Sequence, residues 1–487
     1  MTREQRKPTL LEALVPVIFL IFMLAINVYI FGDDALSGSN QIVLILSGTV
    51  AALIGLRIGA TWDQMQQGIV KSISDAMASI LILLLIGSLA GTWLLSGIVP
   101  AMIYYGLQIL NPTIFLFAAC VVSAIVSLAT GSSWSTIATI GIALLGIGKT
   151  LGLSEGVVAG AIISGAYFGD KMSPLSDTTN LAPAMAGTDL FTHIRYMTLT
   201  TVPSISIALI IFIIMGLVGD SAPITENIEM VLASIDNTFN INGWLFLVPA
   251  LVIFLIVKKV PALPALLLGT LLGALFALIF QPNIVRAVSG VTDNFLVAAY
   301  VGIMKAIYTN IAITTDNELV NSLLSTGGMA GMLNTIWLII CAMIFGGIME
   351  SVGLLHRITE SVIKLVHSTG SLIASTVGTC IFFNVTASDQ YLAIIVPGRM
   401  YANTYKDRNL KPENLSRALE DSGTVTSVLV PWNTCGATQS TVLGVATITY
   451  LPYCFFNIIS PFMSILFGYL NIKIARYKKE EEEKVLV

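Results

Sequence analysis

Four clusters of oxygen-bearing side chains interrupt an otherwise apolar sequence of 487 residues. Glycine or proline residues lie beside them, and these residues break a helix and free its backbone carbonyl groups. The clusters consist of Thr130, Ser132, Ser133 and Ser135; Asp170, Lys171, Ser173, Ser176, Asp177, Thr178, Thr179 and Asn180; Asn384, Thr386, Ser388 and Asp389; and Glu420, Asp421, Ser422, Thr424, Thr426, Asn433, Thr434 and Thr438. Oxygen ligands suit hard cations such as Na⁺, whereas soft transition metals prefer thiolate or imidazole. The clusters therefore predict a cation-binding site.

The carboxylates of these clusters cannot face lipid. Each would cost about 2.5–3.5 kcal/mol at the centre of a membrane helix, so each must face a cavity, pair with a base or bind a proton. Asp177 and Asp389 have no basic neighbour in the sequence, which favours a direct ion or proton role. Asp170 could instead form an ion pair with the adjacent Lys171.

Other members of the clusters have ordinary structural explanations. Arg417 precedes Glu420 and Asp421 by three and four residues, which is the spacing of a helix salt bridge. We therefore expect one of these two carboxylates to pair with Arg417. A single Ser or Thr in a membrane helix often bonds only to its own backbone, so the concentration of hydroxyls at four breaks carries the argument.

The composition places the chain in a membrane. Apolar residues make up 55% of it, charged residues 11%, and the mean hydropathy is +0.87, whereas a soluble protein carries about a quarter charged residues. A secreted protein, a nucleic-acid-binding protein and a soluble enzyme are excluded, the second also by the net charge of −4. The five cysteines form no CxxC pair and the three histidines are scattered, so we expect no cofactor and no zinc site.

The apolar stretches predict an all-α polytopic protein with about ten spans and two re-entrant hairpins, near 112–148 and 370–400. The region 281–330 is too polar for a clean span. The spans are expected at 13–31, 41–60, 76–98, 157–187, 197–218, 243–257, 261–280, 333–355, 414–445 and 450–470, with 157–187 and 414–445 interrupted.

Basic residues orient these spans, because cytoplasmic loops carry an excess of Lys and Arg. Arg3, Arg6 and Lys7 place the N-terminus in the cytoplasm, as Lys258 and Lys259 place their loop. The expected organisation is a cytoplasmic N-terminus (1–9), a first transmembrane repeat (10–218), an external acidic loop (219–242), a second repeat (243–471) and a charged cytoplasmic tail (472–487).

Two stretches of the sequence repeat. TGSSWSTIATIG (130–141) aligns with TASDQYLAIIVP (386–397) at an offset of 256, and Gly97 aligns with Gly353 at the same offset. GDKMSPLSDTTNLAP (169–183) aligns with GTVTSVLVPWNTCGA (423–437) at an offset of 254. Five spans in each half is an odd number, so the second copy must be inverted relative to the first. Inverted repeats with discontinuous helices at the midplane are typical of secondary transporters.

A buried carboxylate also suggests how such a site couples two ions. A carboxylate withdrawn from water holds a proton more readily, and a bound cation displaces that proton. If the site crosses the membrane only when it holds one or the other, exchange of cation for proton follows by alternating access.

The motifs resemble those of the NhaC family of bacterial Na⁺/H⁺ antiporters. GSSWSTIATIGIALLGIGKTLGL and the long string GDKMSPLSDTTNLAP carry the likeness in the first half, and ASDQYLAIIVPGRMY and LEDSGTVTSVLVPWNTCGA carry it in the second. The resemblance implies an inner-membrane protein of the ion-transporter superfamily, with inverted repeats, paired hairpins and an elevator-like moving domain. It implies that the hairpin tips approach the broken helices and bind Na⁺ there, at Asp177 and Asp389. The remaining expected ligands are Ser132, Ser133, Asp170, Thr178, Thr179, Asn180, Ser388, Asn433 and Thr434.

The substrate is not settled by the resemblance. The family includes malate/lactate antiporters, so a Na⁺- and H⁺-coupled exchanger of a small organic acid, or an amino-acid transporter of the same fold, is the alternative. A carboxylate substrate would need a cation, and Lys171 and Arg399 are the basic residues near the breaks. A passive channel with a polar filter is a second class. The expected partners are Na⁺, H⁺, membrane lipid and, in the alternative, an organic acid; a homodimer is left open and nucleic acid is excluded.

Overall fold

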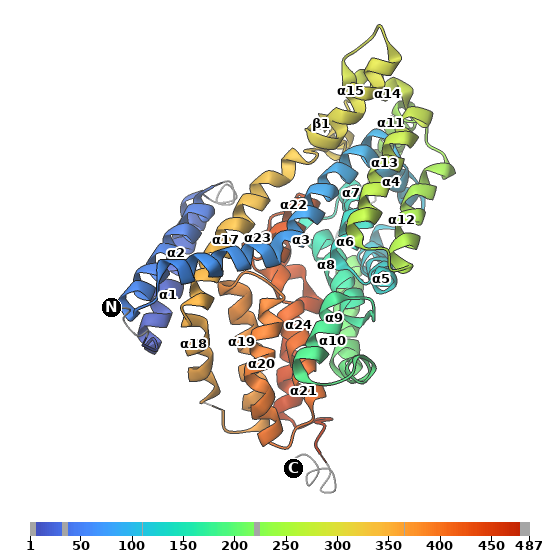
Figure 1. Ribbon diagram of the computed structural model, residues 1–487. Coiled ribbons are helices and arrows are strands. Elements are labelled where there is room, and N and C mark those ends of the chain that lie inside the picture. Colours follow the sequence, from blue (N-terminus) through green and yellow to red (C-terminus); the bar gives the residue numbers. More distant parts are fainter. Residues whose placement is uncertain (1–5, 32–37, 110, 219–224, 365, 478–487) are drawn as a thin grey trace.

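The computed structural model describes residues 6–31, 38–109, 111–218, 225–364 and 366–477, which are almost entirely helical (Figure 1). The first half contains α1 (Leu10–Phe31), α2 (Ser39–Ile58), α3 (Trp62–Leu95), α4 (Ile98–Ile109), α5 (Pro112–Thr130), α6 (Ser133–Thr136), α7 (Ile142–Thr150), α8 (Glu155–Met172), α9 (Asp177–Ala186) and α10 (Leu190–Val218).

The second half begins with a more irregular region. It contains α11 (Thr225–Thr238), α12 (Leu247–Val257), α13 (Ala262–Phe280), α14 (Pro282–Ser289), α15 (Phe295–Tyr308), α16 (Glu318–Leu323) and a hairpin of two short antiparallel strands, β1 (Ile311–Ala312) and β2 (Ser325–Thr326). The region 281–330, for which no clean span was expected, thus contains α14 and α15, which pack on each other, the short helix α16 and a small strand hairpin. The chain continues with α17 (Leu333–Ser351), α18 (Leu354–Ile363), α19 (Thr369–Thr386), α20 (Leu392–Asp407), α21 (Pro412–Leu419), α22 (Thr434–Leu443), α23 (Thr447–Tyr450) and α24 (Phe455–Tyr469).

Within the described ranges, eight helices are long and apolar enough to cross a membrane, or up to ten if two bent pairs are each one span. The prediction of a polytopic helical membrane protein is confirmed. The helices that could cross the membrane are not all the predicted ones. Helices α5 and α19 are the first arms of the expected hairpins, yet they are 19 and 18 residues long and could each cross the membrane alone. Whether the hairpins re-enter the membrane stays a prediction.

The acidic segment 219–242 differs from a simple loop, since α11 occupies much of it. Val231, Ile235 and Phe239 recur at helical spacing and are buried. A loop was predicted from the number of acidic residues, without regard to the helical spacing of these apolar residues. Residues 219–224 lie outside the described part, and the side of the membrane on which α11 lies stays a prediction.

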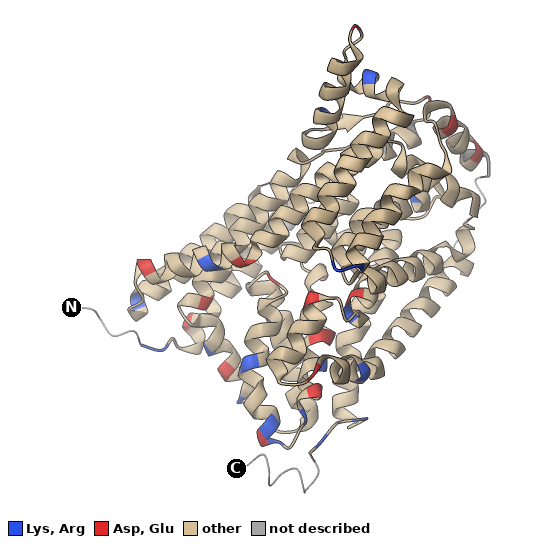
Figure 2. Ribbon diagram, turned by 45° about the vertical axis from the view of Figure 1, so that its right-hand side comes forward, with Lys and Arg blue, Asp and Glu red and all other residues tan. Residues whose placement is uncertain are grey.

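The helices pack in two groups (Figure 1). The scaffold group is defined here as α1, α2, α3, α13, α15 and α17. Helices α13, α15 and α17 pack on the 34-residue helix α3, α2 packs on α17, and α1 packs on α2. The hairpin group is α5, α8, α9, α10, α19, α20, α21 and α24. Each half of the chain contributes to both groups. Charged residues are sparse along the long helices, apart from a small set in the middle of the molecule (Figure 2).

Helices α3 and α17 occupy equivalent positions in the two halves and run in opposite directions. Gly68, near the start of α3, lies against Ser351 at the end of α17, whereas Gly87 lies against Met332, just before α17 begins. Each helix ends at a left-handed glycine, Gly97 or Gly353, with φ of +81° in both cases. A short helix, α4 or α18, follows directly. Gly97 and Gly353, which the sequence aligned at an offset of 256, thus share one backbone conformation, and the inverted repeat as a whole stays a prediction.

The hairpin tips and broken helices also repeat in their hydrogen bonds. Ser132 accepts a bond from the N–H of Ser135 (3.2 Å), and Asp389 accepts one from the N–H of Leu392 (3.0 Å). Both pairs are separated by 257 residues, since 389 minus 132 is 257. Ser127 donates to the carbonyl of Ala166 (2.5 Å), and Asn384, 257 residues later, donates to the carbonyl of Gly423 (2.8 Å).

This common offset corrects the sequence alignment. The alignment at 256 around the hairpin tips is out of register by one residue, and the alignment at 254 around the broken helices is out by three. The first alignment was based on the identical Thr130 and Thr386, and the second on the identical Gly169 and Gly423. The structure pairs residues instead by the backbone group that each caps.

A substitution at Gly353 tests the turn between α17 and α18. A Cβ at Gly353 would meet nothing within 4 Å, so only the left-handed φ opposes a side chain there. We expect Gly353→Ala to lower the free energy of unfolding by about 1–2 kcal/mol. The matched control is Gly378→Ala in α19, where a Cβ also meets nothing within 4 Å but φ is helical, and which should stabilise by about 0.5–1 kcal/mol. Thermal unfolding in detergent measures both. Equal shifts of the two variants, or stabilisation by Gly353→Ala, would contradict the assigned turn.

Candidate ion-binding site

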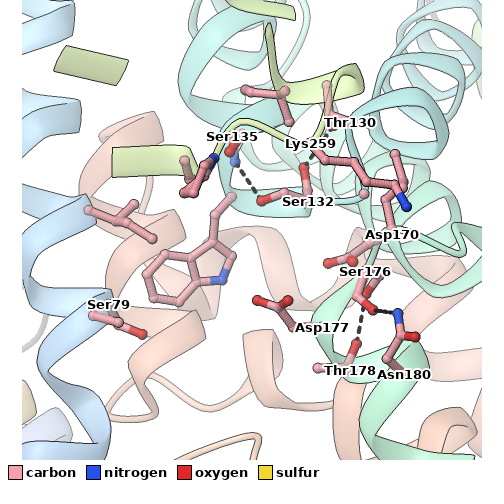
Figure 3. Close-up of a pocket in the computed structure, with 18 of the residues that line it drawn as sticks. Ser79, Thr130, Ser132, Ser135, Asp170, Ser176, Asp177, Thr178, Asn180 and Lys259 are labelled. Carbon is pink, nitrogen blue, oxygen red and sulfur yellow. Dashed lines mark hydrogen bonds between the residues drawn. The ribbon is translucent and has the colours of Figure 1, made fainter. Parts of the chain in front are cut away.

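A cavity of about 610 Å³ lies where the first hairpin tip, the break between α8 and α9 and the turn between α12 and α13 meet (Figure 3). It contains Ser132, Asp170, Asp177, Thr178 and Asn180 from the predicted site. The other polar side chains that line it are Ser79, Thr130, Ser135, Ser176, Lys259, Gln390 and Tyr391.

The break between α8 and α9 is closed by its own side chains. Ser176 caps α9 by accepting a hydrogen bond from the N–H of Thr179 (3.4 Å). The Thr179 hydroxyl donates to the carbonyls of Asp170 (3.2 Å) and Lys171 (3.0 Å) at the end of α8. Asn180 donates to the carbonyl of Ser176 (2.7 Å). Thr179 and Asn180, both predicted ligands, thus use their side chains to bond to backbone carbonyl groups on both sides of the break.

Asp170 joins the broken helix to the first hairpin. Its Oδ2 accepts hydrogen bonds from the backbone N–H (3.1 Å) and the hydroxyl (2.7 Å) of Ser133, the first residue of α6. The hairpin tip is held close, because a Cβ at Gly131 would lie 2.6 Å from the Cβ of Leu175 in the break. The alternative in which Asp170 pairs with Lys171 is wrong.

Asp177 is the first residue of α9 and is exposed to the cavity (Figure 3). Among the described residues, none forms a hydrogen bond or ion pair with its carboxylate. Asp177 also lines a second, larger cavity of about 1030 Å³, which shares Ser79 and Tyr391 with the first. Asp389 lines this second cavity, so the two carboxylates predicted to bind Na⁺ face one space.

The second hairpin tip meets the break before α22 in a similar way. Ser388 has a left-handed backbone, with φ of +60°, and its carbonyl accepts from the N–H of Thr434 (2.9 Å). Asn433 caps α22, because its side-chain oxygen accepts a hydrogen bond from the N–H of Cys435 (3.0 Å). Its side-chain amide donates to the carbonyl of Asn384 (3.0 Å). These predicted ligands are buried and are absent from the lining of both cavities. They hold the tip against the break.

Lys171 lies away from both cavities. It is fully buried, forms an ion pair with Asp421 and donates to the hydroxyl of Ser460 (3.0 Å). Its Nζ also lies 5.6 Å from the ring centre of Phe456. Of the two residues predicted to contact an organic anion, only Arg399 lines one of these cavities. Arg399 is exposed and lines the larger cavity.

The expected salt bridge of Arg417 is wrong. Its guanidinium lies 4.5 Å from the ring centre of Tyr196, and none of its nitrogens has a hydrogen-bond partner among the described residues. Asp421 pairs instead with Lys171, and Glu420 accepts from the hydroxyl of Thr178 (3.1 Å). The carboxylates start a π-helical turn, Glu420–Thr424, in which the usual helical spacing to Arg417 no longer applies.

Several charged residues of the site were missed. Lys259 lines the smaller cavity, whereas the sequence predicted for it only a place in a cytoplasmic loop. The larger cavity is lined by Lys71, Asp75, Glu350 and His356, which belong to α3, α17 and α18. Only helix packing brings these helices to the site. In the sequence, the Lys258–Lys259 pair two residues before Pro261 was the one available signal.

The buried ion pair of Lys171 and Asp421 can be tested by its effect on stability. We expect Lys171→Met to lower the free energy of unfolding by about 3–5 kcal/mol, because it leaves a buried carboxylate without a partner. The double variant Lys171→Met/Asp421→Leu should recover most of that loss, since an apolar pair needs no neutralisation. Thermal unfolding in detergent provides the measurement. If the single variant is as stable as the parent protein, the pair does not hold these helices together.

Comparisons with known proteins agree with the helical membrane architecture. The model of a family described as the Na⁺/H⁺ antiporter family matches residues 165–472. The Na⁺/H⁺ antiporter NhaC of Alkalihalophilus pseudofirmus is 37% identical over 90% of this chain and 91% of its own length. The malate-2H⁺/Na⁺-lactate antiporter of Bacillus subtilis is 36% identical over 99% of each chain. The arginine/ornithine antiporter ArcD of Halobacterium salinarum is 34% identical over 98% of this chain and 95% of its own.

The resemblance to NhaC antiporters that the motifs predicted is confirmed by this near full-length similarity. The chain belongs to the Na⁺/H⁺ antiporter family and is a multi-span membrane transporter rather than an enzyme.

Proposed function

We propose that this protein exchanges Na⁺ for H⁺ across the bacterial cytoplasmic membrane, with both termini in the cytoplasm. The observation that carries the proposal is that Asp177 and Asp389, one from each half of the chain, line one cavity. Relatives named as Na⁺/H⁺ antiporters over most of their length support it.

The charge of the cavity favours a cation. Asp75, Asp177, Glu350 and Asp389 outnumber the two permanently charged bases that line the same space. Asp177 has no partner among the described residues, so its charge is available to a ligand. A hydroxyl or amide oxygen from Ser132, Ser176 or Asn180 would complete the coordination of a small hard cation near the smaller cavity.

Competition between Na⁺ and H⁺ then accounts for exchange. A carboxylate in a cavity between helices is neutralised either by a proton or by a cation, and each excludes the other. A site that crosses the membrane in either neutral form, and not while charged, couples the two fluxes. No further group is required.

The cavities support alternating access by movement of the hairpin group against the scaffold group. The smaller cavity meets α3 at Ala78 and Ile82, and another cavity of about 690 Å³ meets α3 further along, from Ile86 to Leu94. The smaller cavity lies between α3 and the hairpin tips, and the cavity of about 690 Å³ lies between α3 and the end of α22. A displacement along α3 would open one space while it closes the other.

A second candidate is a Na⁺- and H⁺-coupled exchanger of an organic acid or an amino acid. Arg399 in the larger cavity favours it, since a guanidinium binds a carboxylate well. The relatives named as malate/lactate and arginine/ornithine antiporters are similar over nearly the whole chain.

Purified protein in liposomes tests the first proposal. We expect an inward Na⁺ gradient to drive H⁺ out of parent liposomes, as recorded by an entrapped pH-sensitive dye. Asp177→Asn and Asp389→Asn should reduce this flux to the level of empty liposomes, because an amide can bind neither a proton nor a cation with a full charge. The control Asp293→Asn, at an exposed position between α14 and α15, should retain the parent flux.

The same liposomes separate the alternatives. An absolute need for malate, lactate or arginine would reject simple Na⁺/H⁺ exchange and favour the second candidate. Uphill movement of H⁺ against its own gradient requires a carrier, and its absence together with flux that does not saturate would favour a channel.

A further inference from the structure

One cation at the candidate site comes from the scaffold side. Lys259 lies in the turn that joins α12 to α13, outside the hairpins and the broken helices. It lines the smaller cavity together with Asp170, Asp177 and Ser132 (Figure 3). Of the Lys and Arg residues in the described ranges, no other lines this cavity.

The backbone of this turn fixes Lys259 in an unusual conformation. The N–H of Lys259 bonds to the carbonyl of Ile256 (2.8 Å), and the N–H of Val260 bonds to that of Leu255 (3.0 Å), which together close the end of α12. The central residue of this pattern is left-handed, with φ of +65°, and glycine usually occupies it. A lysine here costs conformational free energy, and such strain is found most often where a side chain has a function.

The adjacent lysine has a different environment. Nζ of Lys258 lies 5.6 Å from the ring centre of Phe254, on the same helix, and Lys258 does not line the cavity. Orientation of the loop by positive charge requires only that two lysines remain near the membrane surface. It does not require one of them to reach the carboxylates.

The carboxylates that share the cavity with Lys259 belong to the other packing group. Asp170 ends α8 and Asp177 begins α9, both in the hairpin group, whereas the turn of Lys259 leads into α13 of the scaffold group. An attraction between Lys259 and these carboxylates would therefore act across the boundary along which the groups are proposed to move. It would also be strongest while no transported cation neutralises the site.

We propose that Lys259 is the scaffold's counter-cation for the empty site: it balances Asp170 and Asp177 until an entering cation takes its place. This inference rests on the proposed function and adds a specificity-determining residue to it. Lys259 lowers the apparent affinity for the cation from the face to which this cavity opens. From the opposite face, where the carboxylates would have moved away from the turn, it has no such effect.

Vesicles of defined orientation test this inference. In everted vesicles, whose outer face is the cytoplasmic face expected for the Lys258–Lys259 loop, Lys259→Gln and Lys259→Gly should lower the Na⁺ concentration for half-maximal exchange by about twofold to fivefold, the range of one exposed charge pair. In right-side-out vesicles the value should stay at that of the parent. Lys259→Gly keeps the left-handed turn, so it separates loss of the charge from damage to the fold.

Two further variants sharpen the result. Lys259→Arg keeps the charge and should restore the parent Na⁺ dependence, and Lys258→Gln removes an adjacent charge and should leave it unchanged. A Na⁺ dependence in Lys259→Gln and Lys259→Gly equal to that of the parent, or a shift of equal size from both faces, would overturn the role of Lys259. If parent vesicles show no Na⁺-dependent H⁺ movement at all, the proposed function itself fails, so the two failures are distinguishable.

Discussion

Backbone that leaves the helix inside an apolar membrane must find its hydrogen-bond partners within the protein. The two broken helices meet this constraint in the same way. A hairpin tip approaches each break and is hydrogen-bonded to it. The backbone N–H of Ser133 donates to the carboxylate of Asp170, and the backbone N–H of Thr434 donates to the carbonyl of Ser388. The irregular segments are therefore stable only where a tip and a break meet, which is also where a polar cavity can exist.

The same constraint divides the acidic residues into two kinds. Asp421 is buried and neutralised by Lys171, so this ion pair joins the two halves of the chain. Asp177 faces a cavity without a partner among the described residues, and Asp389 uses one oxygen to cap a helix. Carboxylates of the first kind support the fold, and those of the second kind retain charge that a transported ion could neutralise.

The two hairpin tips share a pattern of backbone caps, but their chemistry is unequal. Ser132 and Asp389 cap equivalent turns 257 residues apart, so the second tip contributes a carboxylate where the first contributes a hydroxyl. The acidic residue of the first break, Asp177, corresponds by the same offset to Thr434. One carboxylate from each half thus reaches the shared space from opposite elements, a hairpin tip in one case and a broken helix in the other.

The membrane environment, most spans, the two breaks and the polar clusters could be predicted from the amino-acid sequence, because hydropathy and composition are properties of short segments. The sequence also indicated Asp177 and Asp389 by their lack of basic neighbours. The partners of the charged residues depend on the packing of the helices: Lys171 pairs with Asp421 and not Asp170, Arg417 stacks on Tyr196, and Lys259 reaches the cavity from a loop. Contacts between residues distant in sequence depend on how helices pack, and neither spacing along one helix nor local charge contains that information.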